Sequence, residues 1–120
     1  MNKSSNSDIV TETVHDVFIV TINLKRATIE EASRLNKLLS DSIADGWNKL
    51  LIELHKVEYI DSTFLGALVI NYKKIIELNG KFGLVGFKAS FHTFIQQMSL
   101  DRTFEIYKTR TDALENFNLD

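Results

Sequence analysis

The chain has 120 residues and a formal net charge of −2, with 44% hydrophobic and 25% charged residues. This length and composition fit one globular domain that can fold without disulfides or a structural metal. The balance of 14 Lys and Arg against 16 Asp and Glu argues against nucleic-acid binding, which uses a basic face. Cysteine is absent, which excludes disulfides, thiolate metal ligands and a cysteine nucleophile.

The first seven residues are polar and lack the apolar core of a signal peptide. We expect residues 1–7 to form a short disordered tail and residues 8–120 to form a single domain. The longest apolar stretch is far shorter than the ~20 residues that a membrane span needs. We therefore expect a cytoplasmic protein that does not insert directly into a membrane.

Strand and helix patterns alternate in the first part of the chain. Residues 9–14 and 17–24 predict two strands joined by a tight turn. Both faces of 17–24 are mostly apolar, which is typical of a central strand covered on both sides. Thr28 and Glu31 form the capping-box pattern that begins a helix, and Gly46 is placed to end it.

The rest of the chain predicts three more strands and three more helices. The strands are expected at residues 50–54, 82–87 and 104–107. The helices are expected at residues 63–78, from Ser90 onward, and after a cap at Thr111. Apolar residues surround much of the first half of 63–78, so we expect that helix to be the best buried. The alternation predicts an α/β fold: a mixed sheet of about five strands with an opening β-hairpin, and about four helices packed against it.

The sequence lacks the usual marks of catalysis. It has no phosphate-binding glycine loop and no nucleophile elbow. His15, His55 and His92 are far apart in the chain, and we expect each to lie at or near the surface. Glu53 lies near the end of the predicted strand 50–54, and because an unpaired buried carboxylate is costly, we expect it to reach water at the sheet edge or end. We expect no enzymatic activity, no cofactor and no metal site.

Residues 60–66 join a strand to a helix and carry the most informative local pattern. Asp61 or Ser62 can act as the helix N-cap. If Asp61 caps, the Ser62 hydroxyl lies in the first turn, where free N–H groups and the helix dipole favour an anion. A phosphate there would add about −1.5 to −2 charges without disturbing the fold. From the local sequence alone, an unmodified helix cap is the simpler interpretation.

The run 57–66, followed by 67–76, resembles the signature segment of STAS domains. More narrowly, it is similar to the bacterial anti-sigma-factor antagonists, which carry a hydrophobic-Asp-Ser-(Ser/Thr/Ala)-Gly-Leu-Gly motif at this junction. The flanking segments agree, including Leu50 to Leu54 and the turn at Asn79-Gly80-Lys81. The likeness covers about residues 8–117 and implies a single STAS-like domain.

The resemblance implies a phosphorylation-switched binding protein. In that family the serine after the Asp is phosphorylated by a serine/threonine kinase that is also the anti-sigma factor. The unphosphorylated antagonist binds this kinase and frees the sigma factor, and phosphorylation breaks the complex. By this likeness Ser62 is the phospho-acceptor, with Thr63 as the alternative hydroxyl, and Asp61 shapes the loop. The docking surface would include Asp61, Ser62, Thr63, Phe64, Leu65 and Gly66, and a phosphatase is a further implied partner.

The sequence departs from the family pattern at two places. Phe64 stands where the family has glycine, and it is either buried, which we favour, or exposed as an apolar anchor. Lys25 and Arg26 stand where the family has an acid that helps to contact the kinase. A reversed charge discriminates strongly between partners, so the partner would be a divergent kinase or not a sigma-pathway kinase at all, unless these two cations only form a solvated loop.

Two other functions stay open. STAS-like proteins also serve as small cytoplasmic subunits of lipid-transport ABC complexes and of stress-signalling scaffolds, where Ser62 would matter little. A small-ligand or nucleotide sensor would use the helix N-terminus as an anion site, but no phosphate loop supports it.

Overall fold

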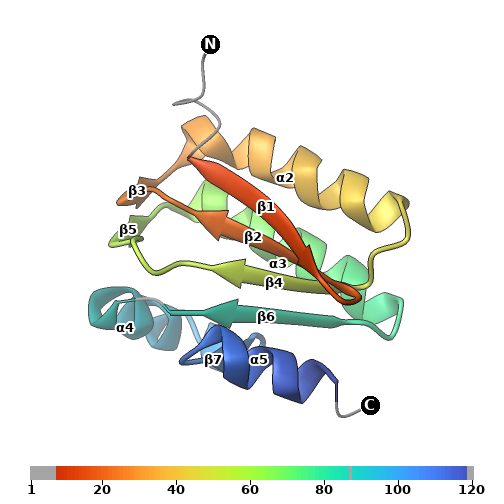
Figure 1. The fold of residues 1–120 in the computed structure, drawn as a ribbon. Helices are drawn as coiled ribbons and strands as arrows, with labels where there is room; N and C mark the ends of the chain where they lie inside the picture. The colour runs from red at the N-terminus through yellow and green to blue at the C-terminus, as the bar shows by residue number, and fades with distance from the viewer. Residues whose placement is uncertain (1–7, 87, 119–120) are drawn as a thin grey trace.

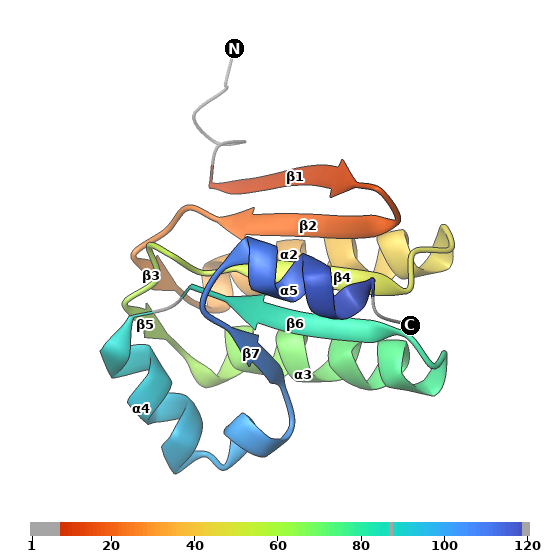
Figure 2. The ribbon, with the colours of Figure 1, turned by 60° about the horizontal axis from the view of Figure 1, so that its bottom comes forward.

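The computed structural model describes residues 8–86 and 88–118, whose main sheet has helices on both faces (Figures 1 and 2). The five strands of the sheet are β1 (Ile9–Val14), β2 (Val17–Ile22), β4 (Lys49–Glu53), β6 (Lys81–Val85) and β7 (Glu105–Tyr107). Their order is β1-β2-β4-β6-β7; β1 runs antiparallel to β2 and the other neighbours are parallel. The predicted mixed sheet with an opening hairpin is confirmed.

Two helices cover one face of the sheet and one covers the other. In Figures 1 and 2, α2 (Ile29–Ala44) and α3 (Ser62–Glu77) lie behind the sheet, and α5 (Arg110–Phe117) lies in front. The fourth helix, α4 (Ala89–Gln97), lies outside the two helical layers, near β5 (Tyr59–Ile60) in Figure 2, and is followed by the short helical turn η1 (Leu100–Arg102). The four predicted helices are therefore present.

The side chains of the interior strand β2 pack into two separate hydrophobic cores. Val20 and Ile22 pack on the side of α2 and α3, whereas Val17 and Ile19 pack on the side of α5. All four side chains are buried. This arrangement confirms the interpretation of an apolar strand covered on both faces.

A second, very small sheet was not predicted. Strand β3 (Arg26–Ala27) pairs in parallel with β5 (Tyr59–Ile60). The Asp61 N–H extends this pairing by donating to the Ala27 carbonyl at 3.1 Å. The pairing brings the segments that precede α2 and α3 side by side, so the N-termini of the two helices lie at the same end of the molecule (Figure 1).

Several helix ends and exposures refine the predictions. The Thr28–Glu31 capping box is present, but α5 is capped by Thr109, whose Oγ1 accepts from the Asp112 N–H at 3.1 Å, and not by Thr111. Helix α3 has six buried residues, yet Ile70 on its apolar surface is 51% exposed. As expected, α3 has more buried residues than α2 or α5, although α2 leaves Ile70 open to solvent.

None of the helices in residues 8–86 and 88–118 is long and apolar enough to cross a membrane. The predicted tail, residues 1–7, lies outside the described residues.

Candidate functional site

Asp61 ties together the N-termini of the two helices behind the sheet. Its Oδ1 accepts a hydrogen bond from the Phe64 N–H at 2.8 Å, which caps α3. Its Oδ2 accepts from the N–H of Ile29, the first residue of α2, at 2.8 Å. Both N–H groups lack partners within their own helices, and a carboxylate at an N-terminus is favoured by the helix dipole. One side chain therefore caps one helix and bonds the next.

The residues after Asp61 divide into an exposed pair and a buried pair. Ser62 and Thr63 are exposed in the first turn of α3, where the Asp61 cap was expected to place the Ser62 hydroxyl. Phe64 is fully buried and Leu65 is 4% exposed. The expected burial of Phe64 is confirmed. In this conformation the side chains of Phe64 and Leu65 face the core. A docking partner would therefore contact these two residues mainly through their backbone atoms.

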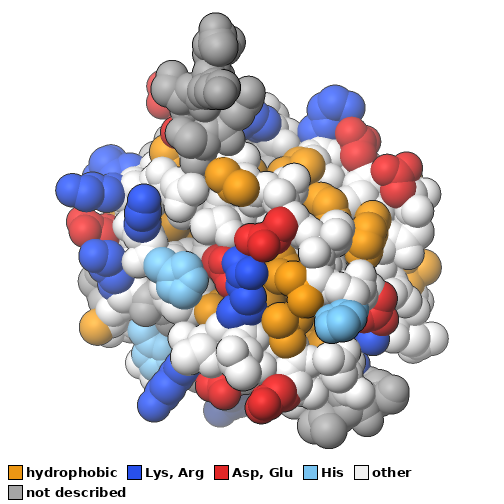
Figure 3. Space-filling view, in the orientation of Figure 1, with side chains coloured by type: hydrophobic (Ala, Val, Ile, Leu, Met, Phe, Trp, Pro, Cys, Tyr) orange, Lys and Arg blue, Asp and Glu red, His pale blue; other side chains and the backbone are white. Residues whose placement is uncertain are grey.

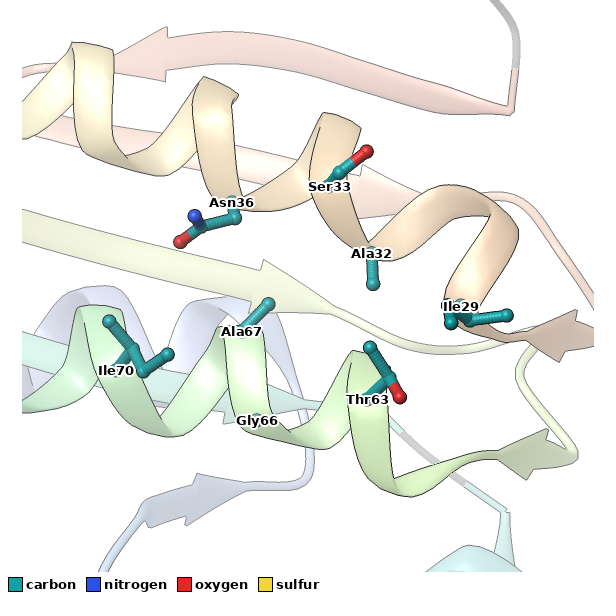
Figure 4. Close-up of a pocket in the computed structure, with 8 residues that line it drawn as sticks. All are labelled: Ile29, Ala32, Ser33, Asn36, Thr63, Gly66, Ala67 and Ile70. Carbon is teal, nitrogen blue, oxygen red and sulfur yellow. The ribbon is translucent and has the colours of Figure 1, made fainter.

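An open groove runs between the first halves of α2 and α3 (Figure 4). Its volume is about 400 Å³, and its lining residues are Ile29, Ala32, Ser33, Asn36, Thr63, Gly66, Ala67 and Ile70. Ile29 is 63% exposed and Ile70 51%, although both are large apolar side chains. Thr63 lies directly beside Ser62 in sequence, so the groove adjoins the predicted phospho-acceptor.

A polar link closes the groove at its other end. Asn71 is fully buried on α3, and its amide donates to the Asn36 side-chain oxygen and to the Ala67 carbonyl, both at 2.8 Å. Its own side-chain oxygen accepts from Ser40 Oγ at 3.2 Å. Because the other link is the bond from Ile29 to Asp61, two polar contacts between the helices bracket the apolar groove.

Gly66 keeps the floor of this groove open. A Cβ placed on Gly66 would meet no atom within 4 Å. Glycine inside a helix destabilises it by about 0.5–1 kcal/mol relative to alanine. The fold therefore does not need glycine at this position, and an alanine would fit and stabilise α3. The glycine instead leaves open space in the groove, on the surface of α3 next to Thr63.

Lys25 and Arg26 lie next to this site, although they are far from it in sequence. The Lys25 carbonyl accepts from the N–H groups of Glu58 at 2.8 Å and Tyr59 at 3.1 Å. The Arg26 guanidinium carbon lies 4.4 Å from the centre of the Tyr59 ring, which is a cation–π contact. Both cations are exposed. The structure thus brings together Asp61, Ser62, Lys25 and Arg26, whose grouping rested only on the resemblance.

The short β3–β5 pairing that achieves this was missed. Two-residue strands have no periodicity to detect. The one available signal was Tyr59, an aromatic residue directly before the strand-to-helix junction. Asn71 was also missed, although an isolated asparagine on the apolar stripe of a predicted helix was visible in the sequence.

Glu53 corrects a prediction on the opposite face of the sheet. It is only 3% exposed, so the expectation that it reaches water at the sheet edge or end is wrong. Arg110 of α5 donates to its two carboxylate oxygens at 2.6 and 2.8 Å, and Thr21 Oγ1 donates at 2.9 Å. Arg110 also binds Glu12. The burial is tolerated because a cation 57 residues away in sequence pairs with it.

Burial on its own would raise the pKa of Glu53. The hydrogen bonds from Arg110 and Thr21, together with the Arg110 charge, outweigh burial and leave the pKa of Glu53 below its usual value. The hydrogen bonds that Arg110 donates, to Glu53 first and then to Glu12, raise the pKa of Arg110. Arg110 thus pairs with both Glu12 and Glu53, and this group of three residues, the charged clamp, holds α5 against the sheet.

Among the described residues, no three His, Cys, Asp or Glu side chains form a group that could hold a metal ion. The three histidines are exposed, as expected. In Figure 3, charges of both signs and apolar side chains are interspersed over most of the visible face. Lys and Arg gather mainly at its left edge, where β3 and β5 lie in Figure 1.

Comparisons with known proteins agree on one family. The family model of the STAS domain matches residues 8–113. A Thermotoga neapolitana protein, provisionally named an anti-sigma factor antagonist, is 37% identical over 103 residues, covering 85% of this chain and 90% of its own. The anti-sigma-F factor antagonist RsfB of Mycobacterium tuberculosis is 33% identical, covering 92% of this chain and 91% of its own.

Solved structures give the same result. The crystal structure of an anti-sigma factor antagonist from Mycobacterium paratuberculosis superimposes with a TM-score of 0.80 and 28% identity, covering 91% of this chain and 92% of that one.

Proposed function

This chain belongs to the STAS domain family, and from that premise we propose that it is an anti-sigma-factor antagonist switched by phosphorylation of Ser62. The relatives that carry this name match nearly the whole chain. In the proposed cycle, unphosphorylated protein binds a serine/threonine kinase that is also the anti-sigma factor, and phosphorylation releases it. A phosphatase would restore the binding form. The protein would act in the cytoplasm and by occupying its partner, not by catalysis.

The observation that carries this proposal is the position of Ser62. Asp61 takes the N-cap position, so the Ser62 hydroxyl is exposed in the first turn of α3. A kinase can reach a hydroxyl there without unfolding the helix. The first-turn N–H groups and the helix dipole favour the added phosphate. Thr63 is also exposed and is the second candidate acceptor.

The groove between α2 and α3 supports a docking role for the same surface. Ile29 and Ile70 expose apolar side chains beside the proposed acceptor, and Gly66 leaves space between the helices. An apolar side chain of the partner that entered this space would remove these groups from water. A phosphate on the neighbouring Ser62 would place about −1.5 to −2 charges at the rim of that contact. Binding and release would thus depend on one surface.

A pull-down with variants at Ser62 tests the proposal. Wild type and Ser62→Ala are expected to recover a kinase-type ATPase from native lysate, whereas Ser62→Asp is expected to lose it. The matched control is Thr111→Asp, which adds the same charge at an exposed first-turn position of α5, on the opposite face of the sheet.

Purified kinase and ATP should then label wild type and not Ser62→Ala. Equal recovery of one partner by all four proteins, without labelling of Ser62, would contradict the switch. That result would favour a constitutive subunit of a transport complex or a signalling scaffold.

A further inference from the structure

The short sheet formed by β3 and β5 carries an exposed cationic surface next to Ser62. We define the cationic edge as Lys25, Arg26 and Tyr59. The Lys25 carbonyl bonds the backbone of Tyr59, and Arg26 is the register partner of Tyr59. Tyr59 precedes Ser62 by three residues. A partner that covers Ser62 would therefore also meet this edge.

The charges of the cationic edge are not neutralised within the part of the chain that the structure describes. No described carboxylate lies within ion-pair distance of Lys25 or Arg26. Neighbouring Lys88, in contrast, pairs with Glu58 at 3.3 Å. The protein as a whole is slightly acidic, with a net charge of −2. Two unpaired cations beside one site are therefore a local feature and not a consequence of composition.

Arg26 is also held in place. Its guanidinium lies over the Tyr59 ring at 4.4 Å, and Tyr59 is itself 45% exposed. Stacking on a ring leaves the in-plane N–H groups of an arginine available to a carboxylate, which they can bind in a bidentate manner. A guanidinium fixed in this way loses less side-chain entropy on binding than a free one.

From these observations we propose that the cationic edge binds an acidic segment of the partner protein, through carboxylates placed on Lys25 and Arg26. The proposal rests on the proposed function, since it names the chemistry of the surface that covers Ser62. It also explains the direction of the switch. A phosphate on Ser62 repels an acidic surface and attracts a basic one, so an acidic partner surface at this position would favour release on phosphorylation.

Other occupants fit less well. A nucleic acid would need a larger basic face than a chain with pI 5.9 offers. Anionic lipid binding normally uses clusters of four to eight basic residues, whereas the defined edge has two. A second copy of this chain would have to present an acidic patch of its own.

The first test uses the isolated protein and a defined probe, an oligoglutamate peptide. Amide resonances of residues 25–27 and 58–62 are expected to shift on titration, and the shifts should weaken as salt rises from about 50 mM to about 300 mM. Arg26→Glu and Lys25→Glu should abolish the shifts. Lys73→Glu, the same charge change at an exposed position of α3, should not. Shifts elsewhere, equal shifts in Arg26→Glu, or no shifts at all would overturn the proposal.

The second test uses the kinase that wild type recovers. Arg26→Glu should weaken its binding by at least about tenfold, because like charges would then face each other, and Lys73→Glu should leave it unchanged. A zero-length carbodiimide should join Lys25 to a partner Asp or Glu.

The two tests separate the two proposals. If the kinase binds and is released through Ser62 but Arg26→Glu binds as wild type does, the acidic-partner inference is wrong and the proposed function stands. If no kinase is recovered, the proposed function fails and the peptide titration alone decides whether the edge selects carboxylates.

Discussion

Replacing Asp61 by asparagine distinguishes an ordinary helix cap from the bridge between two helices. Asparagine and aspartate are about equally good N-caps, so a residue that only caps α3 should tolerate the change. In the structure both carboxylate oxygens are used, one by the Phe64 N–H and one by the Ile29 N–H. An asparagine keeps one oxygen and turns the other acceptor into a donor. Whichever way the amide is oriented, one backbone N–H then faces an NH₂ group.

The size of the effect follows from the two bonds. Loss of an N-cap typically lowers the free energy of unfolding by about 1 kcal/mol. A further solvent-accessible hydrogen bond contributes about 0.5–1.5 kcal/mol. Asp61→Ala removes both contacts and should lower the free energy of unfolding by about 2 kcal/mol. Asp61→Asn should lower it by about 1 kcal/mol, because only the bond to Ile29 is lost.

Urea denaturation measures these differences. With a slope of about 2 kcal/mol per M, the midpoint should fall by roughly 1 M for Asp61→Ala and roughly 0.5 M for Asp61→Asn. Asp45→Asn removes an exposed carboxylate at the C-cap of α2 and serves as the charge control. Hydrogen exchange at the Ile29 amide should accelerate in both Asp61 variants. If Asp61→Asn unfolds at the wild-type midpoint with Ile29 still protected, the bridge does not stabilise the protein.

Three further predictions concern the groove and the charged clamp. Gly66→Ala should raise the free energy of unfolding by about 0.5–1 kcal/mol in urea titrations while weakening partner binding; a destabilised variant would contradict the open space seen above Gly66. Arg110→Met should lower the thermal midpoint by an amount equivalent to about 2 kcal/mol, less than for a fully buried pair because Arg110 is 35% exposed, and an unchanged midpoint would exclude the clamp. The lowered pKa of Glu53 means that its contribution to stability is fully present above the unfolded value of about 4.3 and is lost as pH falls through the lower folded value. Stability should thus fall more steeply in wild type than in Glu53→Gln between about pH 5 and about pH 2, and parallel profiles would show that Glu53 does not titrate differently on folding.

The fold was predictable because most of its elements are long enough to show a period. The nearly continuous apolar run of β2 and the helical stripe of α2 indicate which faces are buried, and a capping box marks where α2 begins. The β3–β5 pairing leaves no such periodic pattern in the sequence. Each strand is two residues long, and their association depends on contacts between segments more than 30 residues apart.

The same limit applies to charged residues. The strand pattern placed Glu53 on a known face, but its surroundings depend on where α5 packs. A carboxylate in that position is either solvated or paired, and local sequence cannot distinguish the two when the cation lies 57 residues later. Asp61 shows the limit at the candidate site: it was one of two cap candidates that the sequence offered for α3, whereas its bond to α2 required the tertiary structure.

Asp61 explains why one covalent change at Ser62 could affect several surfaces at once. Its N–H bonds the carbonyl of Ala27 in β3, and its two carboxylate oxygens bond α3 and α2. Three hydrogen bonds of a single residue therefore join β3, α2 and α3, the elements that carry the cationic edge, the groove and the acceptor hydroxyl. A phosphate on Ser62 would place like charge beside the Asp61 carboxylate, and repulsion between them opposes the same bonds that set the spacing of the two helices. Release of a partner would then not depend on repulsion across the interface alone, because the surface that the partner binds would itself be strained.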